Sequence, residues 1–211
     1  TGVTANQALL DAAIDMKADM VLVHHGYFWK GEQPVITGIA HARIKTLLLN
    51  DMNLVAYHLP LDGQLDFGNN TELARVLDFT TQGQLSSGEQ PPLTFYGQLQ
   101  NPMSGDEFAK HIETKLNRAP LHIAGRANPI KTIAWCTGGA QDFIETAITA
   151  NVDAYLTGEV SERTVNTARE TGIHFYAAGH HATERYGIKA LGEILADKFP
   201  INHNFIDIDN P

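Results

Sequence analysis

The sequence has little cysteine, little positive charge and no long apolar run, and each shortage excludes a class of protein. Cys136 is the only cysteine, so no disulfide can form within the chain, as is typical of a reducing cytosol. The 15 basic and 24 acidic residues give a net charge of −9, which argues against nucleic acid or an anionic membrane as the main partner. No apolar run approaches the roughly 20 residues that span a bilayer, and no signal peptide is visible. We therefore expect a cytoplasmic protein.

Apolar residues are placed so that helices and strands alternate along most of the 211 residues. Short continuous apolar stretches at 20–25 and 53–58 are typical of strands covered on both faces. In the last third we expect strands at 132–136, 153–157, 173–178 and 202–208, and helices at 141–150, 161–171 and 182–198. This order predicts an α/β fold with mainly parallel, helix-covered sheets.

Local signals divide the chain into three parts. Thr4–Gln7 and Ser104–Glu107 have the form of capping boxes, and Asn70 is placed to cap a third helix. Residues 80–92 are rich in Gln, Gly, Ser and Pro and predict a loop or linker, followed by an exposed antiparallel strand at 93–99. We therefore divide the chain into a first α/β lobe (1–80), a linker with an inserted strand-helix-strand segment (81–130) and a second α/β lobe (131–211).

The sequence matches itself weakly when it is shifted by 134 positions. Residues 3–25 then lie over residues 137–159 with five identities, which two similar amphipathic helices could also produce: Gln7/Gln141, Ala13/Ala147, Ile14/Ile148, Asp19/Asp153 and Leu22/Leu156. We interpret the match as an internal repeat, which predicts two similar lobes that face each other across a shared site. A strand at 132–136 precedes the repeat in the second lobe, so the matching strand of the first lobe is expected upstream of Thr1.

Imidazoles and carboxylates interrupt the apolar pattern where strands end. His24 and His25 end one predicted strand before Gly26, and Asp62 follows the next one. His180 and Glu184 are spaced i, i+4 on a predicted helix, so both side chains lie on one face. Each feature alone is explained by a hydrogen-bonded pair, a turn residue or a helix-surface contact. Because ligands gather at the carboxyl ends of parallel strands, the five residues together predict a metal site, in which the adjacent histidines could serve two ions.

Three neighbouring features are candidates for supporting roles. Glu159 ends a predicted strand and His58 lies on the strand that leads to Asp62, so both are candidate general acid or base groups. His181 is turned about 100° from His180 around the helix and is a candidate for the pocket wall. The turn at 137–139 could offer backbone N–H groups to an anion, but we favour a tight turn that simply requires small residues.

Six short motifs resemble the Nif-three-like family, whose bacterial members are commonly labelled GTP cyclohydrolase I type 2 homologues. They extend over the whole chain: Val23-His-His-Gly26, Tyr57-His-Leu-Pro-Leu-Asp62, Asn69-Asn70, Cys136-Thr-Gly-Gly139, Thr157-Gly-Glu159 and Gly179-His-His-Ala-Thr-Glu184.

The resemblance implies two related α/β lobes, a dinuclear metal centre between them and a toroidal homohexamer. The matching ligands are His24, His25, Asp62, His180 and Glu184, with His180 rather than His181 as the ligand. The chain departs from the family at Arg163, where many members have a histidine.

The mixed imidazole and carboxylate ligand set suits two divalent ions of Zn, Fe, Mn, Co or Ni and does not choose among them. Five side chains do not saturate two ions, so water or hydroxide is expected to complete their coordination. A hydroxide bridging such a pair is a nucleophile near neutral pH. The first hypothesis is therefore a metal-dependent hydrolase acting on a nucleotide, a phosphoester or a cyclic amide. A non-enzymatic metal-binding assembly or regulatory protein, and a redox or metal-handling role with iron, are the alternatives.

Overall fold

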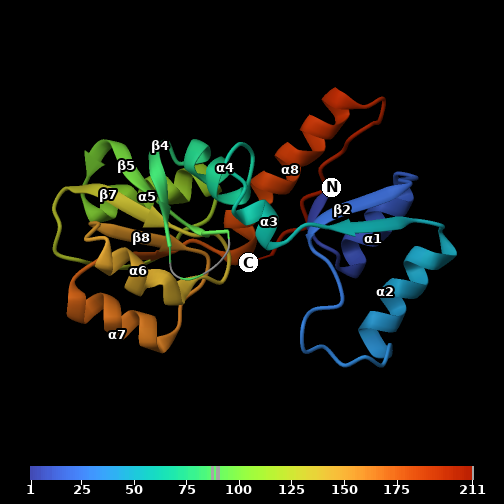
Figure 1. Cartoon of the computed structure of the whole chain (residues 1–211), viewed down its shortest axis with the longest axis horizontal. Helices are drawn as coiled ribbons and strands as arrows, with labels where there is room; N and C mark the ends of the chain where they lie inside the picture. Colours follow the sequence, from blue (N-terminus) through green and yellow to red (C-terminus); the bar gives the residue numbers. More distant parts are fainter. Residues whose placement is uncertain (87, 89–90, 211) are drawn as a thin grey trace.

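The computed structural model describes residues 1–86, 88 and 91–210, which form two sheets with the long helix α8 (His180–Lys198) between them (Figure 1). The smaller sheet is wholly parallel in the order β1-β2-β3, formed by Gly2–Thr4, Met20–His25 and Asn53–Ala56. Side chains of β2 alternate between its faces. Val21 and Val23 pack with helices α1 (Gln7–Asp15) and α2 (Gly38–Leu49), whereas Leu22 packs with Ile188 of α8.

The larger sheet has the strand order β4-β5-β7-β8-β9-β6. Its strands are β4 (Phe79–Leu85), β5 (Thr94–Met103), β6 (Leu121–Ile123), β7 (Ile130–Trp135), β8 (Ala154–Thr157) and β9 (His174–Ala177). The β7-β8-β9 pairs are parallel, and the outer pairs are antiparallel. The fold is therefore a mixed α/β fold, in which the predicted parallel pairing holds for the smaller sheet and for the centre of the larger one.

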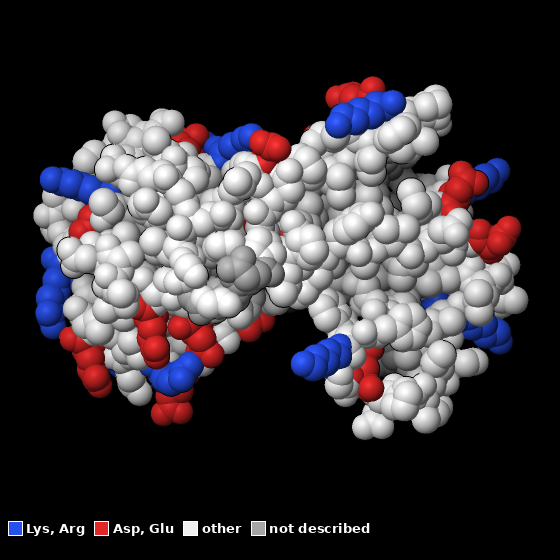
Figure 2. All heavy atoms as spheres, viewed as in Figure 1, with Lys and Arg blue, Asp and Glu red and all other residues white. Residues whose placement is uncertain are grey.

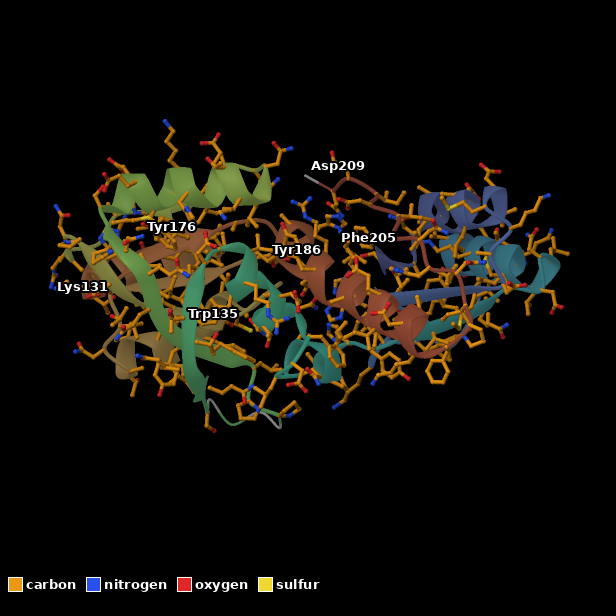
Figure 3. All side chains as sticks on the ribbon, turned by 90° about the horizontal axis from the view of Figure 1, so that it is seen from above. Lys131, Trp135, Tyr176, Tyr186, Phe205 and Asp209 are labelled. Carbon is orange, nitrogen blue, oxygen red and sulfur yellow. The ribbon has the colours of Figure 1, made fainter. Side chains whose placement is uncertain are left out.

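Helices cover both faces of the larger sheet, and its central strands are therefore buried on both sides. Helices α4 (Asn69–Val76) and α5 (Gly105–Leu116) pack on the face that carries Trp135 and Tyr176 (Figure 3). On the opposite face, Tyr155 and Phe175 pack against α6 (Ile144–Thr149) and α7 (Glu162–Thr171). The short helices α3 (Leu59–Asp62) and η1 (Gln141–Phe143) follow β3 and β7 and carry the chain away from two strand ends.

Two of the three predicted helix starts are wrong. The side chain that caps α1 is that of Asn6, whose Oδ1 accepts a hydrogen bond from Leu9 N at 2.9 Å, while Thr4 belongs to β1. Asn70 lies inside α4, which follows Gly68, because its amide is used in contacts to other elements. The capping box at Ser104 is confirmed by reciprocal hydrogen bonds with Glu107.

Three strand predictions also differ from the structure. Strand β4 begins the region predicted as a loop, and β5 is an internal strand between β4 and β7 rather than an exposed one. Residues 202–208 form no strand; their apolar side chains pack beside the smaller sheet, and Ile206 N donates to Thr1 O at 2.9 Å. Strand β1 pairs in parallel with β2, and the strand expected upstream of Thr1 stays a prediction.

The two parallel triplets, β1-β2-β3 and β7-β8-β9, resemble each other in strand order. This likeness agrees with the predicted repeat and with the predicted division into two lobes, both of which stay predictions. On the face shown in Figure 2, Lys and Arg side chains are scattered around the periphery rather than gathered into one patch. No described helix has both the length and the apolar character that a membrane crossing requires.

Candidate metal centre

The five predicted ligands come together where strands of both sheets end. His24 and His25 are the last residues of β2, and Asp62 ends α3, which directly follows β3. His180 and Glu184 occupy the first two turns of α8, which follows β9. His24, Asp62 and Glu184 are buried, whereas His25 and His180 are partly exposed. The strand ends therefore place a buried carboxylate pair beneath two histidines that remain accessible.

The histidine Nε2 atoms all face the Glu184 carboxylate. His180 Nε2 lies 3.0 Å and His25 Nε2 lies 3.2 Å from Glu184 Oε2. His24 Nε2 lies 3.5 Å from Glu184 Oε1 and 3.4 Å from Asp62 Oδ1. Three sets of potential ligand atoms among the described residues lie within 4.8 Å of one another: His24/Asp62/Glu184, His25/His180/Glu184 and His24/His25/His58. Glu184 is the one carboxylate that belongs to two of these three sets.

The opposite nitrogen of each of these rings is held by a separate partner. His24 Nδ1 donates to Tyr57 O at 2.9 Å, and His180 Nδ1 donates to Glu159 Oε1 at 2.7 Å. His25 Nδ1 lies 3.0 Å from the hydroxyl of Thr4. A histidine that donates from Nδ1 presents an unprotonated Nε2, which is the form that binds a metal ion.

These residues fit a metal ion better than they fit one another. Glu184 Oε2 is buried, and with the neighbouring imidazoles neutral and protonated on Nδ1 it has no hydrogen-bond donor within the described residues, which is costly for a carboxylate. The Nε2 atoms that surround it are acceptors when Nδ1 carries the proton, so acceptor faces acceptor. A cation between them would satisfy both sides.

The pKa values of the metal-free side chains show which group compensates Glu184 when no ion is bound. Hydrogen bonding to Glu184 raises the pKa of His180 to about 9, whereas burial lowers that of His25 to about 4. Burial raises the pKa of Asp62 to about 6. Burial alone would also raise the pKa of Glu184, but the hydrogen bonds and charges of His180 and His24 outweigh it and bring the value to about 2. Without a cation, a protonated His180 therefore balances the Glu184 charge.

Sequence reasoning missed the polar side chains that hold the carboxylates. Asn69 Nδ2 donates to Asp62 Oδ1 at 2.8 Å, and Asn69 Oδ1 accepts from Gly187 N at 3.1 Å, so this side chain links α4 and α8 to Asp62. Thr137 Oγ1 donates to the same Asp62 oxygen at 3.3 Å. Asn69 and Thr137 stand inside the motifs quoted for the family resemblance, which is the only signal that could have identified them.

The small-residue interpretation of the turn after β7 agrees with the structure. Gly138 has φ +70°, and a side chain there would collide with Glu184 Oε1. Its N–H donates to Thr183 Oγ1 at 3.0 Å, and its carbonyl accepts from Gly158 N at 2.9 Å, so these backbone groups are used within the chain. The turn brings β7 against the first turn of α8.

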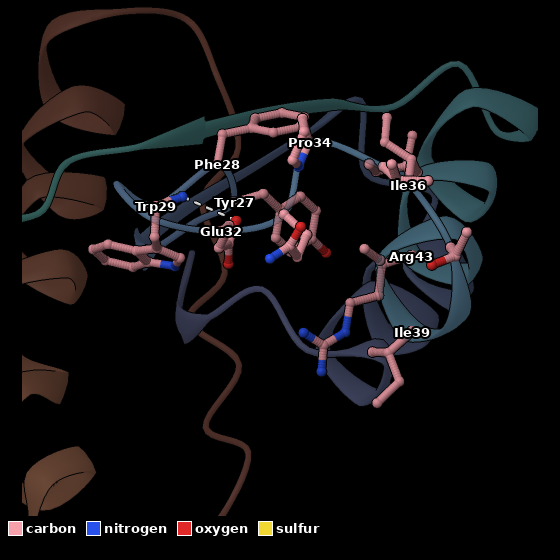
Figure 4. A pocket seen from close by; sticks show the side chains of 13 residues that line it. Tyr27, Phe28, Trp29, Glu32, Pro34, Ile36, Ile39 and Arg43 are labelled. Carbon is pink, nitrogen blue, oxygen red and sulfur yellow. Dashed lines mark hydrogen bonds between the residues drawn. The ribbon is translucent and has the colours of Figure 1, made fainter.

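His58 and Trp29 extend the cluster outward. The His58 ring centre lies 4.9 Å from that of His24 and 5.4 Å from that of His25. Trp29 stands edge-on to His58 at 4.6 Å and borders a cavity of about 570 Å³, in which Glu32 accepts a hydrogen bond from the Trp29 backbone (Figure 4). His181 lines a second cavity, which His25 also lines, and is hydrogen bonded to Asp207 at 2.7 Å. The predicted pocket-wall position of His181 therefore agrees with the structure.

Comparison with known proteins gives one consistent result. The family model described as Duf34/NIF3 (NGG1p interacting factor 3) matches residues 1–211. A protein of Pseudomonas aeruginosa called "GTP cyclohydrolase 1 type 2 homolog" is 57% identical over 211 residues, covering 100% of this chain and 83% of the relative. A protein of Escherichia coli K12 with the same name is 54% identical over 213 residues, covering 100% of this chain and 84% of the relative.

Solved structures agree with this result. A structure described as "protein ybgI, unknown function" superposes with a TM-score of 0.95 at 53% identity, covering 100% of this chain and 83% of the other. TTHA1606 of Thermus thermophilus superposes with a TM-score of 0.84 at 28% identity, covering 100% of this chain and 82% of the other.

Proposed function

The chain belongs to the Duf34/NIF3 family, and from this premise we propose that it is a dinuclear metal-dependent hydrolase. The substrate would be a small molecule, namely a nucleotide, a phosphoester or a cyclic amide. The observation that carries the proposal is the position of Glu184, whose carboxylate is shared by two sets of potential ligands.

The geometry around Glu184 supports two ions rather than one. Its Oε1 faces His24, which also neighbours Asp62, whereas its Oε2 faces His25 and His180. One carboxylate with a separate ligand group on each oxygen is the arrangement expected of a bridging ligand. In this proposal His24 and Asp62 would hold one ion, His25 and His180 would hold the other, and Glu184 would contribute to both.

Two divalent ions bound here would lower the pKa of a water molecule between them and polarise the bond under attack. The neighbouring side chains divide the remaining work. Because Glu159 accepts from His180 Nδ1, it orients that ring. His58 is partly buried, lies beside His24 and His25, and has a pKa lowered chiefly by burial. A neutral imidazole at this position can accept a proton, so His58 is the stronger candidate for general base and Glu159 for a positioning role.

A non-enzymatic role in assembly is the second candidate, and one observation favours it. The candidate ligands come from β2 and from α3 after β3 of the smaller sheet, and from α8 after β9 of the larger one. Bound ions would therefore hold the two sheets together whether or not a substrate is turned over.

The homohexameric toroid implied by the family resemblance belongs to this proposal as well. Ile39, Leu48 and Leu49 of α2 are 70–77% exposed, which leaves an apolar helix surface that a second copy could cover. Light scattering should then give a mass near six chains.

Metal content and turnover of a Glu184→Gln variant test the hydrolase proposal. The wild-type protein should hold about two ions per chain by plasma mass spectrometry and hydrolyse members of a nucleotide, phosphoester and cyclic-amide panel. A neutral side-chain amide at this position cannot bridge two cations, so the variant should hold less than one ion and lose turnover. Glu193→Gln is the matched control, because Glu193 lies on the same helix and pairs only with Lys189 at 4.0 Å among the described residues. A fully loaded wild-type protein that turns over nothing on the panel would refute hydrolysis and favour the assembly role.

A further inference from the structure

A second cavity, of about 410 Å³, opens directly beside the candidate metal centre. The candidate ligands His25 and His180 form part of its wall, together with Glu159 and Arg118. Arg118 is the only Lys or Arg side chain among the described residues that line this cavity. A molecule that fills the cavity would therefore touch the metal ligands at one side and a guanidinium group at the other.

The position of Arg118 is set by a hydrogen bond of its own backbone and by the contact of its side chain with the backbone of Gly179. The residue follows α5 and the left-handed Asn117, and its backbone N donates to Glu113 O at 3.2 Å. Its side chain then crosses Gly179, where an added Cβ would lie only 2.7 Å from Arg118 Cδ. Gly179 has φ +100° and is the residue immediately before α8. The glycine thus leaves space for the guanidinium beside the first turn of the helix that carries His180 and Glu184.

This guanidinium has no counterion within the described part of the chain. Arg163 and Arg185 pair with Asp142 and Asp207, whereas none of the ion pairs there includes Arg118. The Nε atom of Arg118 is buried and lacks an acceptor among the described residues. Because a buried donor without an acceptor costs free energy, a group from outside the chain would gain by supplying one.

Two further features favour an oxyanion as that group. Helix α8 begins at His180 without a side-chain cap, so the positive end of its dipole points to the same region. The carboxylate in the described cavity wall, that of Glu159, is already hydrogen bonded to His180 at 2.7 Å. This hydrogen bond offsets part of the Glu159 charge and so weakens its repulsion of an anion at Arg118. A planar guanidinium binds two oxygens of a phosphate at once, which an ammonium group does not.

We propose that Arg118 is the anchor for a phosphate group of the substrate and holds it against the exposed edge formed by His25 and His180. This inference rests on the proposed hydrolase function and narrows its substrate class to phosphorylated small molecules. Arg118 is then a residue for substrate binding and specificity. The bond that reacts would lie in the part of the substrate between the phosphate bound by Arg118 and the candidate metal ligands.

Binding of inorganic phosphate, measured by isothermal titration calorimetry, tests the proposal on the full chain. Each protein is titrated with and without divalent metal, after its metal content has been determined. Arg118→Gln should weaken phosphate binding about 10-fold or more, and Arg118→Lys should fall between it and wild type, because Lys keeps the charge but loses the fork. The metal content of both variants should equal that of wild type. Arg126→Gln is the matched control, since Arg126 also crosses a positive-φ glycine, Gly172, but lies outside the cavity.

The outcomes separate this inference from the function on which it rests. If the chain holds no metal, the hydrolase proposal fails, while phosphate binding to the metal-free protein still reports on Arg118. Equal phosphate affinity of wild type and Arg118→Gln, or no phosphate binding by wild type in either state, overturns the inference. So does an equal loss in Arg126→Gln. Tighter binding of acetate than of phosphate, with the same dependence on Arg118, would overturn the phosphate assignment in favour of a carboxylate.

Discussion

At the scale of single residues, the candidate ligands are oriented by groups that are not ligands themselves. Tyr57 O and Glu159 each accept a hydrogen bond from the Nδ1 atom of a histidine, and Asn69 donates one to Asp62. Such partners fix both the tautomer and the direction of a ring before any ion arrives. The sequence pointed to the candidate ligands because imidazoles and carboxylates stand out in apolar strand ends. It did not point to the carbonyl of Tyr57, because any residue at that position has one.

The pKa of His180 predicts how metal binding responds to pH. Its raised value, about 9, means that the metal-free ring is mostly protonated at about pH 7.5 and must lose that proton to coordinate an ion. Metal affinity should therefore increase as the pH rises toward 9 and decrease as it falls. The stability of the metal-free protein should change in the opposite direction. A raised histidine pKa contributes stability below about 6.5, and this contribution is lost as the pH rises through about 9.

Metal binding should release the proton of His180. Calorimetric titration in buffers of different ionisation enthalpy measures the number of protons released, which should be about one per chain for the ion at His180. His180→Asn should release fewer protons. An identical release from wild type and variant would show that another group supplies the proton.

At the scale of helices and strands, the packing of the β7 turn against α8 determines the shape of the site. Gly138 fits only because it lacks a side chain beside Glu184, and its positive φ adds strain for any other residue. Gly138→Ala should therefore displace the Glu184 carboxylate, reduce metal content to less than half and lower stability by about 1–3 kcal/mol.

Gly172→Ala provides the comparison for Gly138→Ala. Gly172 has φ +77° at the end of α7, and its Cβ would meet the flexible Arg126 side chain instead of a candidate ligand. This variant should lose a similar amount of stability, measured by urea unfolding, but keep its metal. If both variants retained metal equally, the close approach of Gly138 to Glu184 would have no role in metal binding.

Strands and helices with a clear period were predictable from sequence, and those stabilised by distant partners were not. The apolar run at 20–25 and the amphipathic α7 follow from side-chain pattern alone. Strand β4 carries the sequence Phe-Thr-Thr-Gln-Gly-Gln-Leu, which is polar enough to indicate a loop, and it becomes a strand because β5 supplies its hydrogen bonds. Residues 202–208 have the apolar residues of a strand but pack their side chains without joining a sheet ladder.

At the scale of the whole molecule, the candidate site joins segments that no local pattern relates. The packing of α8 brings these segments together, because the helix contacts α4 as well as β1 and β2. In Figure 3, Tyr186 of this helix and Phe205 of the segment after it lie in the central region between the two sheets. The convergence of His24 with His180 could be predicted only from parallel topology and family resemblance, because neither residue carries information about the other.

Removal of metal should therefore destabilise the whole molecule. An ion present at 100 times its dissociation constant stabilises the native state by about 2.7 kcal/mol, which for a chain of this size corresponds to a Tm change of about 5–10 °C. We expect EDTA to lower the Tm of the metal-loaded protein by that amount in differential scanning calorimetry. Glu184→Gln should show little response to EDTA, and a wild-type Tm unchanged by the chelator would exclude a structural contribution from bound ions.

Helix α8 contributes the last of the candidate ligands in chain order, and this has a consequence for biosynthesis. His24, His25 and Asp62 leave the ribosome long before His180 and Glu184 do. A nascent chain can thus offer only three of the five candidate ligands, with the carboxylate that would belong to both ions still missing. If the ions bind as proposed, metallation follows the translation of α8, and a ribosome-bound chain arrested before this helix should acquire no pair of ions.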